Sequence, residues 1–229
     1  MVDVLRFTSA VSVAVGRGAV VLPYPWRVDS AARAYAVGED AELAGWREDG
    51  GWSLSPTDLA RIPEGTRLVL PSPNGSALAF GAREAVPDAT VLAGCLRNAA
   101  AVATVAAQQD APVAVVAAGE RWQGSSGPLR PAVEDLLGAG AVLRALVDAG
   151  GRPAGGASPE ARAAIAAFDA ARDDLGGWLA DSASGRELVG IGFGDDVEAA
   201  ARLDAEDVAA VLDGPAFSRV AAESAGPLR

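Results

Sequence analysis

The sequence contains no histidine among its 229 residues. This absence excludes histidine phosphatases, Ser-His-Asp hydrolases and zinc sites with histidine ligands. A general acid or base must therefore be Asp, Glu, Tyr, the single cysteine Cys95 or a metal-bound water. Hydrolytic chemistry in this chain would depend mainly on carboxylates and on any metal they hold.

Cysteine is nearly absent and lysine is absent. With Cys95 alone no disulfide can form within the chain, and all 19 basic residues are arginine. The 30 acidic residues give a formal charge of −11, which argues against nucleic acid and anionic membranes as partners. An acidic chain can still bind a small phosphorylated anion where an arginine or a divalent metal reverses the charge of one cleft.

Long apolar runs are also missing. No run approaches the roughly 18 residues of a membrane span, and the chain does not begin with a signal-peptide pattern. These two absences predict a cytoplasmic protein. Half of the residues are hydrophobic, although only 5% are aromatic, so a large core of small side chains is expected.

Short apolar runs alternate with helix-like segments in the first 149 residues. Strands are predicted at 19–22, 42–45, 67–70, 90–94 and 113–117, and helices at 28–37, 76–83, 98–109 and 133–149. This alternation is typical of an α/β fold with a largely parallel sheet and helical layers. Residues 157–220 resemble a helical layer packed on that sheet. We therefore predict a single compact domain, 1–229, with its core sheet in about 1–149.

The first candidate site is the segment Asp3-Val4-Leu5-Arg6-Phe7-Thr8-Ser9, directly before an apolar helix-like stretch. Backbone amides at a helix N-terminus, the helix dipole and the guanidinium of Arg6 all favour a phosphate dianion. Asp3 offers oxygen ligands to a hard cation. In the plainer interpretation Thr8 or Ser9 only caps the helix, while Arg6 pairs with a surface acid.

Two familiar phosphatase patterns fail at single positions. A haloacid-dehalogenase-type site requires a second aspartate two residues after the first, and Leu5 stands there after Asp3. A cysteine-phosphatase loop requires an arginine where Ala101 follows Cys95 by six residues. Cys95 is therefore interpreted as a small buried apolar residue.

Two further segments follow predicted strands and offer polar groups. Asn74-Gly75-Ser76 lies between a strand and a helix, where Gly75 permits close backbone approach to a ligand. Asn98 has the same placement after the strand at 90–94. The alternatives are an ordinary strand-to-helix turn for the first segment and an N-cap for Asn98.

Glu134 and Asp135 are adjacent acids in the first turn of the helix predicted at 133–149. Such acids often only complement the helix dipole. They are also good ligands for a hard metal if that turn faces the cleft. Glu120, just after the strand at 113–117, would belong to the same rim.

Taken in order, these segments resemble the signatures of the 2-phosphosulfolactate phosphatase family. Residues 3–9 resemble its Asp-Val-Leu-Arg-Ala-Thr-(Ser/Thr) signature, and residues 74–78 its Asn-Gly-Thr segment. Residues 95–99 are similar to its segment ending in Asn-Ala. Ala117-Ala118-Gly119-Glu120, Glu134-Asp135 and Gly138-Ala139-Gly140 resemble its later Ala-Gly, Glu-Asp and Ala-Gly pieces. The resemblance spans nearly the whole chain.

The resemblance implies a Mg²⁺-dependent phosphomonoesterase of coenzyme M biosynthesis. Its substrate would be 2-phosphosulfolactate, or a related phosphorylated hydroxy acid, hydrolysed to sulfolactate and phosphate. By position, the implied catalytic residues are Asp3, Arg6 and Glu134, and the implied metal ligands are Asp3, Glu134 and Asp135. The implied substrate-binding residues are Thr8, Ser9, Asn74, Gly75, Ser76 and Asn98. The implied partner is a small phosphorylated anion, and assembly into a homo-oligomer is compatible with this interpretation.

The chain departs from the family pattern in three places. It has Ala44-Gly45-Trp46-Arg47 where the family has Ala-Gly-Glu-Arg, and Ser53-Leu54-Ser55-Pro56 where the family has Gly-Asn-Ser-Pro. Only two residues precede Asp3, where the family has a strand. Either the start codon was placed too late, which we expect, or the chain lacks most of a central strand. If the acid replaced by Trp46 contacts metal or substrate, the alternative is a catalytically impaired protein that still binds an anion or phosphoester.

Overall fold

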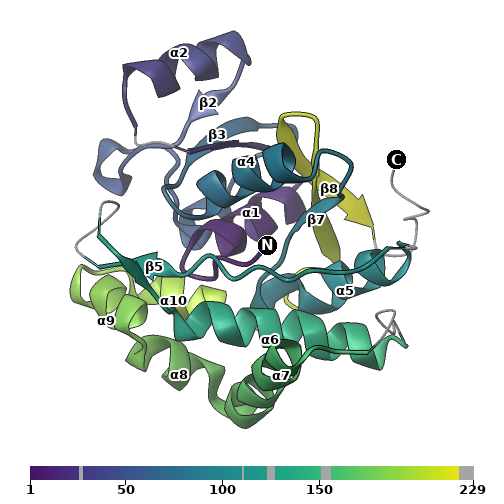
Figure 1. Ribbon diagram of the computed structural model, residues 1–229. Coiled ribbons are helices and arrows are strands. Elements are labelled where there is room, and N and C mark those ends of the chain that lie inside the picture. Colours follow the sequence, from purple (N-terminus) through teal and green to yellow (C-terminus); the bar gives the residue numbers. More distant parts are fainter. Residues whose placement is uncertain (26–27, 110, 123–126, 151–155, 222–229) are drawn as a thin grey trace.

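A six-stranded sheet lies at the centre of the molecule, and helices cover it (Figure 1). The computed structural model describes residues 1–229 except 26–27, 110, 123–126, 151–155 and 222–229. The strands are β1 (Val20–Tyr24), β2 (Glu42–Leu43), β3 (Arg67–Pro71), β4 (Val91–Ala93), β5 (Glu120–Arg121), β6 (Leu129–Arg130), β7 (Val208–Asp213) and β8 (Ala216–Ala221).

The α-helices are α1 (Phe7–Gly16), α2 (Ser30–Gly38), α3 (Pro56–Leu59), α4 (Gly75–Ala85), α5 (Ala99–Ala107), α6 (Val133–Asp148), α7 (Pro159–Ala171), α8 (Leu175–Asp181), α9 (Ala183–Gly190) and α10 (Gly194–Ala200). Single 3₁₀ turns occur at η1 (Arg47–Asp49), η2 (Leu96–Asn98) and η3 (Arg172–Asp174). Asp29 caps α2, because its carboxylate accepts a hydrogen bond from the amide of Ala32 at 2.8 Å.

The sheet has the order β2-β3-β1-β8-β7-β4. β2, β3 and β1 run parallel, with Leu22 opposite Val69. β8 is antiparallel to β1, and β7 is antiparallel to both β8 and β4. The α/β class and the single domain predicted from the sequence are confirmed. The sheet is a mixed one, because the β7–β8 hairpin adds antiparallel pairs to the parallel β2-β3-β1 group.

The end of the chain differs from the sequence interpretation. Helices α7 to α10 occupy much of 159–200, as predicted, but residues 208–221 form strands in place of the helical layer expected up to 220. Residues 208–211 are all buried, and a continuous apolar run of this kind does not distinguish a buried strand from a buried helix. Pairing with β4 and β8 decides in favour of the strand.

The segment predicted as a strand at 113–117 lies beside Val2 rather than in a regular ladder. Val2 forms parallel bridges to Gly94 and to Ala117. Its amide donates to the carbonyl of Val116 at 2.8 Å, and its carbonyl accepts from the amide of Ala118 at 2.8 Å. These contacts place Asp3, the next residue in the chain, beside the end of β4.

Neighbouring strand residues face opposite sides of the sheet, and each side has its own helices. Val21 and Ala210 pack with α1 on one side. Leu22 packs with α2 on the other side, where Ala209 packs in the same cluster as α5 and α6. None of the described helices is both long enough and apolar enough to cross a membrane.

Gly138 brings α6 against the N-terminal segment. A Cβ atom added at Gly138 would lie 2.5 Å from Cγ2 of Val4 and 2.9 Å from Cγ1 of Val2. A larger residue would push α6 away from these valines. The glycine therefore helps to place the first turn of α6 beside Asp3.

Candidate active site

The loop from Asp3 to α1 is closed by its own hydroxyl groups. The hydroxyl of Thr8 donates to the carbonyl of Asp3 at 2.8 Å and accepts from the amide of Asp3 at 3.0 Å. The hydroxyl of Ser9 donates to the carbonyl of Val4 at 2.7 Å. Both hydroxyl-bearing residues are fully buried. Thr8 and Ser9 therefore hold the backbone of this loop in place, and their expected contact with substrate stays a prediction.

The carboxylate of Asp3 is buried and accepts backbone hydrogen bonds. The amide of Phe7 donates to its Oδ1 at 3.3 Å, and the amide of Gly75 also donates to it. Burial raises the pKa of Asp3 from 3.8 to about 7, and the nearby carboxylates of Glu120 and Glu134 add to the rise. The two backbone hydrogen bonds offset part of that rise. Asp3 can therefore exchange a proton near neutral pH.

Asp135 connects α6 to two other segments of the site. Its Oδ1 accepts from the amide of Val4 at 2.7 Å, and its Oδ2 accepts from the amide of Gly119 at 2.9 Å. Burial raises the pKa of Asp135 well above its ordinary value, and the charges of Asp3 and Glu134 raise it further. With both oxygens bonded to backbone amides, Asp135 fixes the relative positions of these segments.

Glu134 is buried, with 3% of its surface exposed. Among the described residues no group donates a hydrogen bond to its carboxylate, so neither oxygen is committed to a protein donor. Its charge acts on Asp3 and Asp135, which places the three acids predicted from the sequence around one point. The structure thus brings Asp3, Glu134 and Asp135 together, while their roles as catalysts and ligands stay predictions.

Asn74 and Gly75 reach the same site from the start of α4. The side-chain amide of Asn74 donates to Oε1 of Glu120 at 3.0 Å. A Cβ added at Gly75 would lie 2.6 Å from Oδ2 of Asp3 and would also overlap the ring of Phe7. Only glycine fits this approach. Glu120, which the sequence predicts at the rim of the site, therefore lies close to Asp3.

Ser76 and Asn98 are fully buried and bond within the protein. The hydroxyl of Ser76 donates to the carbonyl of Leu70 at 3.0 Å. The side chain of Asn98 accepts from the amide of Cys95 at 3.0 Å and donates to the carbonyl of Ala93 at 3.1 Å. Asn98 precedes α5, as expected for an N-cap, but its side chain makes no cap bond. Both residues shape strand-to-helix turns, and their expected role in substrate binding stays a prediction.

Arg6 does not pair with a surface acid. Its Nη1 donates to Oδ2 of Asp196 at 2.7 Å, and Asp196 is fully buried. Arg6 and Arg47 both lie on the ring of Phe193. Asp196 and Phe193 were not singled out from the sequence, because no local motif links α10 to a residue 190 positions earlier.

Arg130 supplies a second buried guanidinium near the acids. It donates to the carboxylate of Glu187 at 2.8 and 3.3 Å and to the hydroxyl of Ser184 at 3.1 Å. The hydrogen bonds that Arg130 donates to Glu187 raise its pKa, and the charges of Glu120 and Glu134 contribute to the rise. Its buried Nε has no hydrogen-bond partner among the described residues. No sequence motif marks this arginine as part of the site.

A divalent cation fits this set of ligands only in part. Among the described residues no group of three or more Asp, Glu or Cys side chains is arranged to hold a metal ion. Mg²⁺, however, is usually bound through one or two carboxylates together with waters and substrate phosphate. Asp3 and Glu134 provide such hard oxygen donors, and a cation would offset the mutual repulsion of these acids. Asp135, with both oxygens occupied, is the weakest of the three expected ligands.

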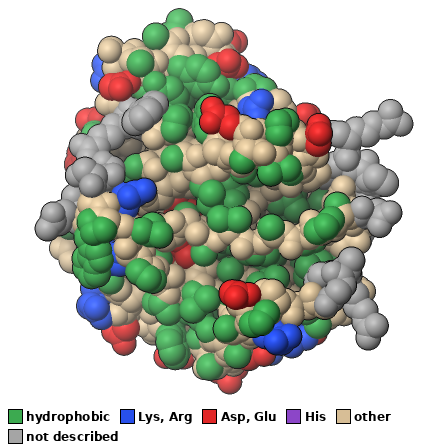
Figure 2. All heavy atoms as spheres, viewed as in Figure 1, with side chains coloured by type: hydrophobic (Ala, Val, Ile, Leu, Met, Phe, Trp, Pro, Cys, Tyr) green, Lys and Arg blue, Asp and Glu red, His purple; other side chains and the backbone are tan. Residues whose placement is uncertain are grey.

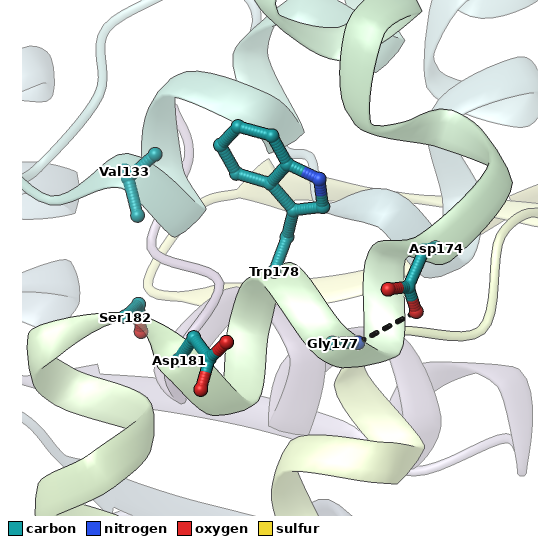
Figure 3. A pocket seen from close by; sticks show the side chains of 6 residues that line it. All are labelled: Val133, Asp174, Gly177, Trp178, Asp181 and Ser182. Carbon is teal, nitrogen blue, oxygen red and sulfur yellow. Dashed lines mark hydrogen bonds between the residues drawn. The ribbon is translucent and has the colours of Figure 1, made fainter.

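A separate hollow of about 400 Å³ lies between the start of α6 and α8 (Figure 3). Its lining residues are Val133, Asp174, Gly177, Trp178, Asp181 and Ser182. Asp174 and Asp181 are its charged residues, so the hollow repels a phosphorylated anion. Figure 2 shows acidic atoms also near the middle of the face that it displays, among hydrophobic and uncharged ones. The site at Asp3 suits an anion better because the guanidinium of Arg130 interacts with its acids Glu120 and Glu134.

Trp46, which replaces an acid of the family pattern, has 70% of its surface exposed. Its side chain therefore lies on the surface rather than among the buried carboxylates. Next to it, Arg47 keeps the arginine of that pattern and contacts Phe193. The side chain of Trp46 therefore takes no part in the buried acid cluster.

Comparison with known proteins identifies the relatives of this chain. The family model described as 2-phosphosulpholactate phosphatase matches residues 1–215. Proteins named probable 2-phosphosulfolactate phosphatase from Gloeobacter violaceus and Prochlorococcus marinus are each 30% identical, covering 89% of this chain and 83% and 84% of their own lengths. A protein of the same name from Carboxydothermus hydrogenoformans is 29% identical over 91% of this chain and 83% of its own. With the ordered motifs and the converging acids, this match shows that the chain belongs to the 2-phosphosulfolactate phosphatase family.

Proposed function

We propose that this protein hydrolyses the phosphate monoester of 2-phosphosulfolactate, or of a closely related phosphorylated hydroxy acid. Water supplies the oxygen of the new P–O bond, the ester P–O bond breaks, and the alcohol and inorganic phosphate are released. The observation that carries the proposal is the cluster of buried acids around Asp3, with Arg130 in electrostatic contact with Glu120 and Glu134 and with Arg6 in the loop that follows Asp3. The family match and the names of the relatives support the same reaction.

In this proposal the acids accept and donate protons, and the arginines bind the negatively charged phosphoryl group. The pKa of Asp3, raised to about 7 by burial, suits a group that takes or returns a proton near neutral pH. Glu134, whose carboxylate is free of hydrogen bonds within the described part of the chain, is the second candidate for orienting water. Arg6 and Arg130 would stabilise the negative charge of the transferring phosphoryl group.

The proposed cofactor is Mg²⁺, held by Asp3 and Glu134. When bound, it would act as a Lewis acid on the phosphoryl oxygens. The carboxylates Asp3 and Glu134 would fix its position, and the amide hydrogen bonds to Asp3 and Asp135 would keep the surrounding backbone rigid. Burial of the acids excludes bulk water from the reacting atoms.

The test is phosphate release from 2-phosphosulfolactate, with 2-phospholactate as an analogue that lacks the sulfonate, in Mg²⁺ and in EDTA. We expect release to require Mg²⁺, and the variants Asp3→Asn and Glu134→Gln to lose at least about 100-fold in kcat/KM. Asp148→Asn, at the opposite and exposed end of α6, is the matched control and should keep wild-type kinetics.

Two results would contradict the proposal. One is undiminished turnover in either site variant while the control behaves as wild type. The other is the absence of phosphate release from any ester by folded protein in Mg²⁺. The location in the cytoplasm, the link to coenzyme M biosynthesis and assembly into a homo-oligomer stay predictions.

A further inference from the structure

Asp196, in α10, is a fully buried carboxylate that joins segments far apart in the sequence. Its Oδ2 accepts from Nη1 of Arg6 at 2.7 Å. Its Oδ1 accepts from the hydroxyl of Ser55 at 2.5 Å and from the hydroxyl of Thr57 at 2.7 Å. Hydrogen bonds to an ionised acceptor are roughly twice as strong as neutral ones. Asp196 therefore fixes the guanidinium of Arg6 relative to the turn at 55–57.

The ring of Phe193, just before α10, contacts two guanidinium groups. The Cζ atoms of Arg6 and Arg47 lie 4.5 and 5.1 Å from its centroid. Arg47 is held by the hydroxyl of Thr57 at 2.9 Å and by Oδ1 of Asp58 at 3.2 Å. Two like charges on one ring repel each other, so nearby acids are needed to keep both side chains in place.

Arg6 and Arg47 keep N–H donors free for a ligand, whereas the buried carboxylate of Asp196 is not accessible to a ligand. Among the described contacts, one of the five N–H donors of Arg6 bonds to Asp196. The side chains of Arg6 and Arg47 are 17% and 33% exposed, but that of Asp196 is 0% exposed. A ligand can thus touch both guanidinium groups without touching the carboxylate that orients them.

We propose that Asp196 is a positioning residue for an anion-binding pair formed by Arg6 and Arg47. It holds Arg6 directly. It holds Arg47 through Thr57, whose hydroxyl donates to Asp196 and accepts from Arg47. The pair binds two anionic groups of one substrate, the phosphate and a second acid group. The inference rests on the proposed function, because it specifies how the phosphorylated acid is oriented beside Asp3.

The test replaces Asp196 by asparagine. Asp196→Asn keeps an oxygen for Ser55 and Thr57 but can place an N–H₂ group against Arg6, so Arg6 is released. Misplacing a substrate-orienting group costs about 100-fold in kcat/KM, and we expect a loss of that order together with a raised KM. The double variant Arg6→Ala/Asp196→Asn should fall no further than Arg6→Ala alone, because both substitutions remove one interaction.

Chemical rescue gives a readout that a merely structural role would not move. Added guanidinium ion should restore part of the activity of Arg6→Ala, where the Asp196 carboxylate remains to bind it. It should not restore the double variant. Equal rescue of both variants would overturn the proposal.

Glu206→Gln is the matched control. Glu206 pairs with Arg97 at 2.8 Å, and Arg97 also donates to the carbonyl of Ala199 in α10. The substitution therefore weakens a second attachment of the same helix without touching Arg6. We expect kcat/KM within about threefold of wild type. A loss equal to that of Asp196→Asn would mean that loosening of α10 explains both, and the proposal would be wrong.

Calorimetric binding of inorganic phosphate in Mg²⁺ separates this inference from the proposed reaction. We expect Arg6→Ala and Asp196→Asn each to weaken phosphate binding about tenfold, with no further loss in the double variant. That pattern without hydrolysis of any ester would support the positioning role while rejecting the phosphatase activity. Wild-type phosphate affinity in Asp196→Asn would reject the positioning role, whether or not esters are hydrolysed.

Discussion

At the scale of single residues, Asp3 shows how the site combines burial with charge. Desolvation and the acids Glu120 and Glu134 raise its pKa from 3.8 to about 7. Between these values the folded protein keeps a proton that the unfolded chain releases, so the free energy of unfolding falls as the pH rises. A shift of about three pKa units corresponds to about 4 kcal/mol at most. A ligand cation would remove part of this penalty.

The Asp3→Asn variant should therefore be more stable than wild type above pH 7. In EDTA at pH 8 its melting temperature should exceed that of wild type by several degrees, and at pH 4 or below the difference should shrink. Thermal unfolding across this pH range measures the effect. Asp213→Asn, which removes one exposed negative charge at the end of β7, serves as the control. The same gain in both variants, or a gain that does not depend on pH, would be inconsistent with a buried charge at Asp3.

At the scale of elements, the site forms where the first turns of α4 and α6 meet the loop before α1. Gly75 opens α4 and gives its amide to Asp3, while Asp135 on α6 bonds to the amides of Val4 and Gly119. Each contact is short because the backbone itself approaches the carboxylate. The precision of the site therefore depends on how closely these elements pack.

Gly75→Ala should disturb this approach. The added Cβ would lie 2.6 Å from Oδ2 of Asp3, so we expect a loss of about 1–3 kcal/mol in stability and a large fall in kcat/KM. Gly81→Ala, in the same helix with nothing within 4 Å of its added Cβ, should be neutral or stabilising by up to about 1 kcal/mol. Denaturant unfolding and phosphate-release kinetics on both variants test this. Equal behaviour of the two alanine variants would refute the close approach.

At the scale of the whole molecule, the last hairpin completes the centre of the sheet. β7 and β8 lie between β4 and β1, so the first and last parts of the chain fold as one unit. Phe217 in β8 is fully buried and packs edge-on against Phe7 in α1, with ring centroids 6.2 Å apart. Phe7 in turn follows Asp3 and Arg6 in the chain. The hairpin therefore packs against the residue that ends the site loop.

Phe217→Ala should cost about 3–5 kcal/mol of unfolding free energy, because it leaves a cavity against α1. The exposed neighbour Arg219→Ala should change stability by less than about 0.5 kcal/mol. Chemical denaturation of both variants, monitored by tryptophan fluorescence, provides the measurement. A small loss at Phe217 would mean that the hairpin contributes little to the core.

Local patterns were sufficient to find part of the fold and part of the site. Most helices and strands up to residue 107 and the helix at 133–148 follow from apolar periodicity, but the short helix α3 was not predicted. Asp3, Glu134 and Gly75 stand at the starts of helices where ligands are expected. The contact between Asp196 and Ser55 could not be predicted, because it spans 141 residues. The strands at 208–221 were not predicted, because the hydrophobic periodicity of a short buried apolar run does not distinguish a strand from a helix.

The sequence by itself determined the family, the order of the motifs and the exclusion of histidine chemistry, since these depend on residue identity alone. Only the tertiary structure decided which polar groups form hydrogen bonds within the protein and which have no partner in the described part of the chain. Thr8, Ser9 and Asn98 bond within the protein, whereas the carboxylate of Glu134 does not. It also decided that Arg6 faces a buried acid. The physical reason is that burial and hydrogen-bond satisfaction belong to the packed chain, and residues distant in sequence supply the partners.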